Sequence, residues 1–227
     1  MALGCAAGSH ISRSQLIVCI IGFVGFTLLA LGAVSDYWVT YGITSAVSAG
    51  SSNGSSPPPQ AALLHREGLW RSCLQYIANN STSVTGHMCF FGLSAPDSLS
   101  MSQGLNSQTR YEVSFLIATW VLYGLGVVLS LIAVVMAIAA LRHKKNQTLL
   151  RGVSAVFILA ALLAFLGLVI YAVRTSKFPN QWPNGDSPYS SSSLAWAYGI
   201  SWVGLLLCFI AGVGHLWVMR RYEDSMI

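Results

Sequence analysis

The sequence has very little charge. Only 8% of its 227 residues are Asp, Glu, Lys or Arg, and 54% are hydrophobic, whereas a soluble domain carries about 25% charged residues. This scarcity excludes an ordinary soluble domain and indicates a membrane protein. The few positive charges stand beside apolar runs rather than on one face of a soluble fold, so the excess of Lys and Arg does not indicate nucleic-acid binding.

Charge is absent from the interior of four long apolar runs, which cover residues 15–34, 113–141, 153–173 and 194–219. Each run is near or above the ~20 residues that a helix needs to cross about 30 Å of hydrocarbon. The first run could instead be the core of a signal peptide, because Arg13 precedes it, but it is longer than the roughly 7 to 15 apolar residues typical of such a core. We therefore predict four transmembrane helices over these ranges.

The segments between the runs differ in their content of Lys and Arg. Residues 1–14, 142–152 and 220–227 carry seven of them within short segments, whereas residues 35–112 and 174–193 carry five. Because cytoplasmic loops are enriched in Lys and Arg, we expect the first group, and with it both termini, in the cytoplasm. The second group then forms two extracellular loops of a multi-pass plasma-membrane protein.

Catalytic and metal-binding patterns are also missing. The five histidines are scattered along the chain with no second histidine or carboxylate at the spacing of a metal site. The sequence has no phosphate-binding glycine loop and no nucleophile elbow. We therefore expect no enzymatic activity, no metal and no cofactor.

The long extracellular segment has the composition of a small folded unit. Residues 36–43, 67–77 and 87–93 are rich in aromatic and β-branched side chains and predict three strands. Residues 44–60 are rich in Ser, Gly and Pro and predict a flexible loop. The predicted fold is an all-α membrane class: a four-transmembrane-helix bundle with an extracellular antiparallel β-sheet.

Five cysteines are distributed over three environments. Cys73 and Cys89 lie in the extracellular segment, Cys19 and Cys208 lie within apolar runs, and Cys5 is in the N-terminal tail. Only the first two share an oxidising compartment and a soluble segment, so we predict a disulfide between them rather than two free thiols. Closing this loop stabilises the sheet by about 3 kcal/mol in the chain-entropy estimate.

A pattern of Trp38, then Gly68-Leu69-Trp70, then Cys73 and Cys89 stands between the first two runs. This pattern resembles the signature of the claudin, peripheral myelin protein and epithelial membrane protein superfamily. Residues 168–174 (LVIYAVR), 194–202 (LAWAYGISW) and 220–224 (RRYED) resemble its peripheral myelin, PERP and VAB-like branches. The calcium-channel gamma branch shares the Gly-Leu-Trp and cysteine features.

The resemblance implies a claudin-like bundle that acts through its extracellular sheet in cell–cell junctions, adhesion or membrane organisation. Partners would be membrane lipid and other membrane proteins in cis or trans, including a second copy. The alternative is an auxiliary, gamma-type subunit that modulates an ion channel or receptor. A paracellular pore is not predicted, because Arg66, Glu67 and Arg71 are too few and too balanced to define a selectivity.

The resemblance also makes Arg110 a candidate anchor beneath the Trp70 loop; the alternative is an arginine that snorkels to the interface. Asp36, Arg110 and Glu112 fall at helix ends, where a charge can pair with a neighbour or with the sheet. Tyr37, Trp38, Trp182 and Trp196 fall at predicted water–lipid boundaries, which favours an aromatic belt. We expect Leu69 and Trp70 of the Gly-Leu-Trp motif to form the apolar underside of the sheet.

Several short motifs predict modifications and contacts. Candidate N-glycosylation sites are Asn53, Asn79 and Asn80, whereas the sequon at Asn146 is predicted to be cytoplasmic and unmodified. Ser225 and Ile227 form a candidate PDZ-binding C-terminus, and a PDZ scaffold would be its partner. Cys5 is a candidate palmitoylation site. Partner recognition is expected in residues 44–60 and 78–86.

Small residues recur at four-residue spacing in the last two runs. Ala160 and Ala164 stand in the third, and Gly204, Cys208 and Gly212 stand in the fourth. Because small side chains let helices approach closely in lipid, these positions predict helix contacts rather than a ligand site.

Overall fold

The computed structural model describes residues 3–43, 61–78, 84–91, 107–142, 147–177 and 189–224. The chain divides into two compact units. We call residues 1–33, 118–169 and 200–227 the helical unit, and residues 34–117 and 170–199 the sheet unit.

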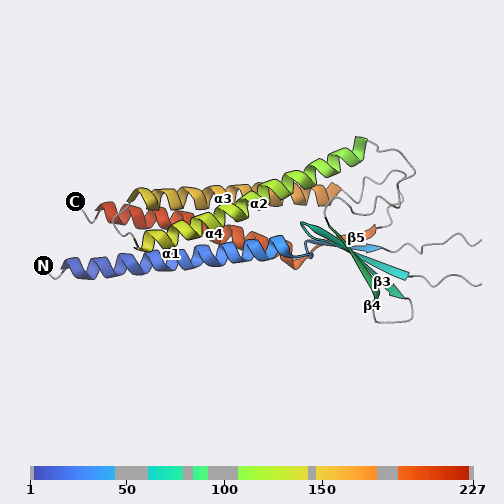
Figure 1. Ribbon diagram of the computed structural model, residues 1–227, viewed down its shortest axis with the longest axis horizontal. Coiled ribbons are helices and arrows are strands. Elements are labelled where there is room, and N and C mark those ends of the chain that lie inside the picture. The colour runs from blue at the N-terminus through green and yellow to red at the C-terminus, as the bar shows by residue number, and fades with distance from the viewer. Residues whose placement is uncertain are drawn as a thin grey trace, which may run out of the picture. The chain divides into compact units, whose positions relative to one another are not determined.

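Four long helices are present, and their bounds are α1 Leu3–Val34, α2 Ser107–Arg142, α3 Gln147–Lys177 and α4 Trp196–Asp224 (Figure 1). All four are long and apolar enough to cross a membrane, over Arg13–Val34, Ser114–Arg142, Thr148–Ser176 and Trp196–Arg221. The predicted four-helix membrane fold is therefore confirmed. Helix α1 begins well before the apolar run, since hydrogen bonding continues a helix into polar residues once a turn exists.

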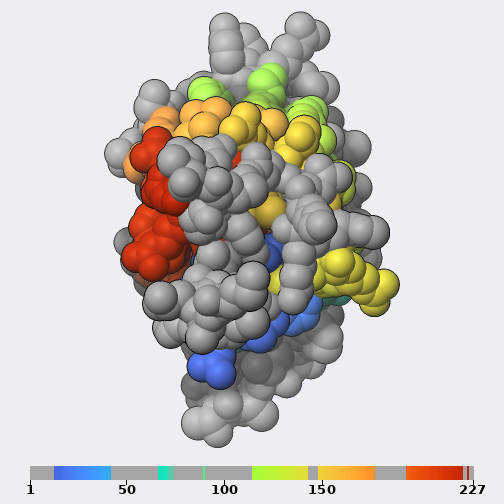
Figure 2. All heavy atoms as spheres, turned by 90° about the vertical axis from the view of Figure 1, so that its left-hand side faces the viewer, coloured from blue at the N-terminus to red at the C-terminus, as the bar shows by residue number. Residues whose placement is uncertain are grey.

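The N-terminal end of α1 and the C-terminal end of α4 lie at the same end of the helical unit (Figure 1). Figure 2 looks onto this end, where blue atoms of α1 and red atoms of α4 are both visible. A bundle of four spans with short connections places its first and last residues on one side, and the helical unit follows this arrangement.

Close backbone contacts hold the helical unit together. A Cβ on Gly204 of α4 would lie 2.9 Å from the carbonyl oxygen of Gly25 and 2.9 Å from the nitrogen of Leu29, both on α1. A Cβ on Gly126 of α2 would lie 2.9 Å from the nitrogen of Ala164 on α3. Neither glycine can carry a side chain without separating two helices, as expected where small residues form the contact.

The other small residues predicted at contacts are also buried. Ala160, Ala164 and Cys208 have no exposed surface, and a Cβ on Gly212 would lie 2.8 Å from Ile158. The prediction that these positions pack helix against helix is confirmed.

Three polar contacts connect helices across the bundle. The Tyr123 hydroxyl of α2 lies 2.9 Å from the Leu29 carbonyl oxygen of α1 and 2.9 Å from the Ser201 hydroxyl of α4. The Ser154 hydroxyl of α3 donates to the Gly212 carbonyl oxygen of α4 at 2.6 Å. Polar side chains within spans are thus directed at backbone carbonyls of neighbouring helices, where lipid offers no substitute.

The sheet unit contains five antiparallel strands in the order β4-β3-β2-β1-β5 (Figure 1). Their bounds are β1 Val39–Ile43, β2 Ala61–Glu67, β3 Arg71–Ala78, β4 Val84–Phe91 and β5 Tyr189–Leu194. The predicted extracellular-segment sheet is present, but two details of the prediction were wrong.

Residues 67–77, predicted as a single strand, contain the last residue of one strand, a turn and most of the next strand. Strand β2 ends at Glu67, and β3 begins at Arg71. The Gly68 N–H donates to the Arg71 carbonyl oxygen at 2.7 Å and closes the turn. A Cβ on Gly68 would lie 2.6 Å from the Ser35 carbonyl oxygen, so only glycine fits where the turn passes the chain that leaves α1. The prediction missed this turn because Leu69 and Trp70 are apolar and fit the composition of a strand.

Strand β5 was not predicted. Its sequence, YSSSSL, has no alternation of apolar and polar residues. It is extended because it pairs with β1, where the Thr40 and Ser193 hydroxyls lie 2.7 Å apart. Cross-strand pairing therefore overrides a weak local preference.

Several predicted features lie outside the described residues: Asn53, Asn79, Asn80, Asn146, Trp182, Ser225, Ile227 and the 44–60 loop. The backbones of Cys5 in α1 and of Arg110 and Glu112 in α2 are described, but their side chains are not.

Candidate functional site

The register of the strands separates two faces of the sheet. Thr40 stands opposite both Arg66 and Ser193, and Cys73 stands opposite both Arg66 and Cys89. Because neighbouring residues of a strand point to opposite faces, these five residues form one face, which we call the disulfide face. Val39, Tyr41 and Glu67 belong to the other, which we call the buried face.

The buried face contains a charged pair. Glu67, the last residue of β2, accepts a hydrogen bond from the Arg174 guanidinium of α3 and forms an ion pair with it. The Tyr41 hydroxyl of β1 donates to the other Glu67 oxygen at 3.3 Å. Both charged side chains are almost fully buried, with 10% and 12% of their surface exposed. Breaking such a pair from one side leaves an uncompensated buried charge.

Trp38 forms the aromatic centre of the same region. Its ring is fully buried and meets the Tyr171 ring edge-on at 4.8 Å and the Tyr198 ring at 6.0 Å. Its backbone N–H donates to the Glu67 carbonyl oxygen at 3.0 Å. The expectation that Trp38 belongs to an interfacial belt was therefore wrong, because the sheet unit encloses the ring. Trp196, at 57% exposed, does have the exposure of a boundary residue.

The Gly-Leu-Trp turn separates its two apolar side chains. Leu69 is buried, whereas 40% of Trp70 is exposed. Leu69 is therefore part of the core, whereas the expectation that the partly exposed Trp70 lies on the underside of the sheet stays a prediction. A tight turn points successive side chains in different directions, and only one of them can enter the core.

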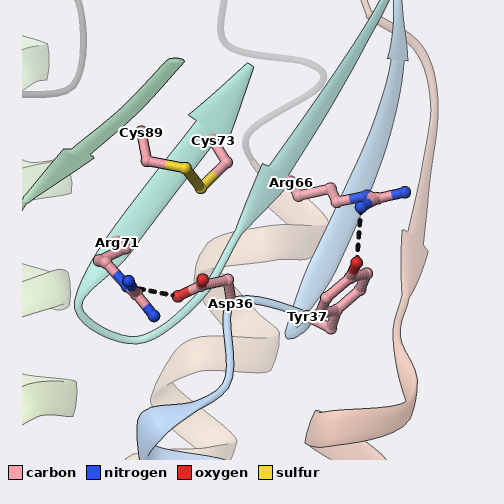
Figure 3. Close-up of a disulfide and its surroundings, with 6 residues drawn as sticks. All are labelled: Asp36, Tyr37, Arg66, Arg71, Cys73 and Cys89. Atoms are coloured by element: carbon pink, nitrogen blue, oxygen red, sulfur yellow. Dashed lines mark hydrogen bonds and ion pairs between the residues drawn. A yellow bond between two sulfur atoms is a disulfide. The ribbon is translucent and has the colours of Figure 1, made fainter. Parts of the chain in front are cut away.

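Two further links fix the turn and the strands beside it (Figure 3). Arg71 at the start of β3 donates its Nε–H to the Asp36 carboxylate at 2.9 Å. Cys73 of β3 and Cys89 of β4 form a disulfide between directly opposed residues. The predicted disulfide is confirmed, and so is the expectation that Asp36 pairs with the sheet.

The ion pairs connect β2 to α3 and β3 to the residues that follow α1, and the disulfide connects β3 to β4. Within the described part of the chain, no group of three or more His, Cys, Asp and Glu side chains could hold a metal ion. Sequence reasoning missed the Glu67–Arg174 pair. The available signal was an arginine directly after the third apolar run and a glutamate directly before Gly-Leu-Trp. The Arg110 anchor stays a prediction, because its side chain lies outside the described residues.

The comparisons with known proteins cover this same region. The family described as PMP-22/EMP/MP20/Claudin tight junction matches residues 23–216. The match includes Trp38, the Gly68-Leu69-Trp70 turn and both disulfide cysteines. The chain belongs to this claudin family. The recognition of the superfamily from these motifs is thus confirmed, whereas its nearest branch stays a prediction.

Two named relatives of this claudin-family protein extend over most of its length. They are the lens fiber membrane intrinsic proteins of Rattus norvegicus and Mus musculus, each 24% identical over 204 residues. Each match covers 88% of this chain and 88% of the relative.

Proposed function

We propose that this claudin-family protein is a non-enzymatic, multi-pass plasma-membrane protein of cell–cell contacts. Its sheet would contact membrane proteins in the same or the opposed membrane, including a second copy. The observation that carries the proposal is the set of links that fix the sheet: the disulfide, the Asp36–Arg71 pair and the buried Glu67–Arg174 pair. A surface fixed before it binds loses less conformational entropy on binding, which favours a contact role.

The topology belongs to the proposal. We place both termini in the cytoplasm because they belong to the Lys- and Arg-rich group of segments, and such segments are enriched on the cytoplasmic side. The shared position of the described ends of α1 and α4 supports two termini on one side (Figure 1). Glycosylation at Asn53, Asn79 or Asn80 with an unmodified Asn146 would agree with this topology, and modification at Asn146 would contradict it.

Mixed cell cultures test the contact role. Cells that express the fluorescently tagged full-length protein are mixed with cells that lack it, and intensity is compared at contacts between two expressing cells and at mixed contacts. If the protein binds a second copy in the opposed membrane, enrichment is expected only at contacts between two expressing cells. If it binds a different partner, enrichment is expected at both kinds of contact. Equal intensity at contacts and free membrane would contradict the proposal.

A channel-auxiliary role gives a different result in the same cells. A gamma-type subunit would copurify stoichiometrically with a pore-forming subunit, and its removal would change that channel's current. The exposed turn residue Trp70 provides a control for either role, since Trp70→Ala changes the accessible surface of the turn without emptying the core. Loss of contact enrichment in this variant, with normal surface delivery, would assign recognition to the turn.

A further inference from the structure

Arg66 carries a charge that no described residue of the sheet unit neutralises. Its Nη1–H donates to the Tyr37 hydroxyl at 2.6 Å, and its guanidinium carbon lies 4.7 Å from the centre of the Tyr37 ring (Figure 3). Both contacts are to a neutral side chain. The Nε–H of Arg66 is buried, and within the described ranges it has no hydrogen-bond acceptor and no carboxylate lies within ion-pair distance of the guanidinium.

The two other arginines of the sheet unit whose side chains are described differ in this respect. Arg71 is paired with the Asp36 carboxylate, and Arg174 is paired with the Glu67 carboxylate. In the view of Figure 3, Arg66 and Arg71 lie on opposite sides of the disulfide, and only Arg71 has an anionic partner in the described part of the chain. Arg71 therefore serves as a natural reference for Arg66.

The surroundings of Arg66 are those of a water–lipid boundary. The Tyr37 ring, which orients the guanidinium, lies 6.0 Å from the Trp196 ring. Trp196 is 57% exposed and is the first residue of the fourth span, and Leu194, at 52% exposed, precedes it. Exposed Trp and Leu side chains beside an arginine match the transition from headgroups to acyl chains.

We propose that Arg66 binds the phosphate of a phospholipid in the adjacent leaflet, with the acyl chains against Trp196 and Leu194. A guanidinium recognises phosphate through paired N–H donors, and the contact with Tyr37 holds its plane in a fixed direction. Thr40, opposite Arg66 in the register, and Ser193, opposite Thr40, place two hydroxyls along the same row of the disulfide face. The exposed apolar neighbours favour a lipid over an acidic segment of a protein.

Lipid titration of the full-length protein tests this site. Purified, delipidated protein in detergent is titrated with dioctanoyl phosphatidylcholine, and bound lipid is counted by native mass spectrometry. Arg66→Gln is expected to weaken binding about tenfold or more, the factor of one charge-assisted hydrogen bond. Arg66→Lys keeps the charge but loses the paired planar donors, so its binding is expected to lie between that of the wild type and that of Arg66→Gln. Arg71→Gln, the matched control, is expected to bind as the wild type does.

Two further ligands distinguish phospholipid binding from the binding of a free anion or of acyl chains alone. Dioctanoylglycerol has the same acyl chains without phosphate and is expected to bind weakly and equally to the wild type and Arg66→Gln. Inorganic phosphate lacks the acyl chains and is expected to bind less tightly than the phospholipid. If Arg66→Gln does not fold, the wild-type comparison of phospholipid with dioctanoylglycerol, together with Arg66→Lys, decides the result.

The proposal is overturned by any of three results. Unchanged phospholipid binding in Arg66→Gln would remove Arg66 from the site, and an equal loss in Arg71→Gln would show a general effect of surface charge. Inorganic phosphate or dioctanoylglycerol binding as tightly as phospholipid would show a free-anion site or a purely apolar contact. None of these results depends on the cell-contact experiment, so the two proposals fail separately.

Discussion

The contacts inside the helical unit differ in kind from the contacts inside the sheet unit. In the helical unit, glycine and alanine bring backbones into contact, and Tyr123 and Ser154 donate hydrogen bonds to carbonyl oxygens of neighbouring helices. In the sheet unit, charged pairs, a disulfide and a cluster of aromatic rings connect segments far apart in the sequence. Lipid gives two helices no hydrophobic reason to associate, so close fit decides their contact. Water penalises exposed apolar surface and permits charge, so a small domain there can use both.

The largest effect is expected from Gly204→Leu. A Cβ at this position would lie 2.9 Å from backbone atoms of α1, and backbone cannot move aside as a flexible side chain can. Helix propensity alone would predict that the substitution stabilises the protein, because leucine favours a helix over glycine by about 0.8 kcal/mol. We expect loss of the monodisperse folded protein in fluorescence-detected size-exclusion chromatography.

Gly199→Leu is the matched control for this change. Gly199 is also in α4, and no atom lies within 4 Å of a Cβ built on it. We expect it to elute and express like the wild type. Equal behaviour of the two variants would mean that the α1–α4 contact does not depend on close approach.

The next largest effect is expected at the buried ion pair. Arg174→Gln leaves the Glu67 charge buried without its partner, which costs about 3–5 kcal/mol and lowers the melting temperature by roughly 6–20 °C. Glu67→Gln should cost a similar amount. The double variant Glu67→Gln/Arg174→Gln should recover part of the loss, because no buried charge remains. Additive losses in thermal melts of the three variants would contradict coupling across the pair.

Reduction of the disulfide should have a smaller effect. Cys73→Ser is expected to lower stability by about 3 kcal/mol through the freed loop, and to cause retention in the secretory pathway. Dithiothreitol should lower the melting temperature of the wild type toward that of Cys73→Ser and leave the variant itself unchanged. Cys19→Ser removes a free thiol and should keep the full response to the reductant; an equal response in all three proteins would contradict a stabilising disulfide.

What could be predicted from the sequence follows the same division. The helices and their small contact residues could be predicted from local composition, as Ala160, Ala164 and Gly204 illustrate. Lipid requires a long apolar run in every span and favours small residues where two helices meet. The disulfide was predictable because compartment leaves only one pair of cysteines. Each of these inferences needs only neighbours in the sequence or the side of the membrane.

The features that sequence reasoning missed depend on distant segments. Glu67 and Arg174 are 107 residues apart. Taken alone, one is a glutamate at the end of a strand and the other an arginine near the end of a span. Strand β5 is extended through its pairing with β1, and Trp38 is buried because Tyr171 and Tyr198, from α3 and α4, surround it. A pattern within one segment contains no information on which other segment will meet it.

The smallest effect is expected at the Asp36–Arg71 pair, which sharpens the comparison within the sheet unit. Its side chains are 24% and 38% exposed, so water already solvates both charges, and Asp36→Asn or Arg71→Gln should cost only about 0.2–1 kcal/mol. Salt should distinguish the two pairs further. At about 1 M ionic strength the Debye length falls to roughly 3 Å, so the difference in melting temperature between the wild type and Asp36→Asn should shrink, while the difference for Glu67→Gln should persist. If salt reduced both differences equally, the Glu67–Arg174 pair would be accessible to solvent, and the sheet unit would depend on its disulfide and aromatic rings instead.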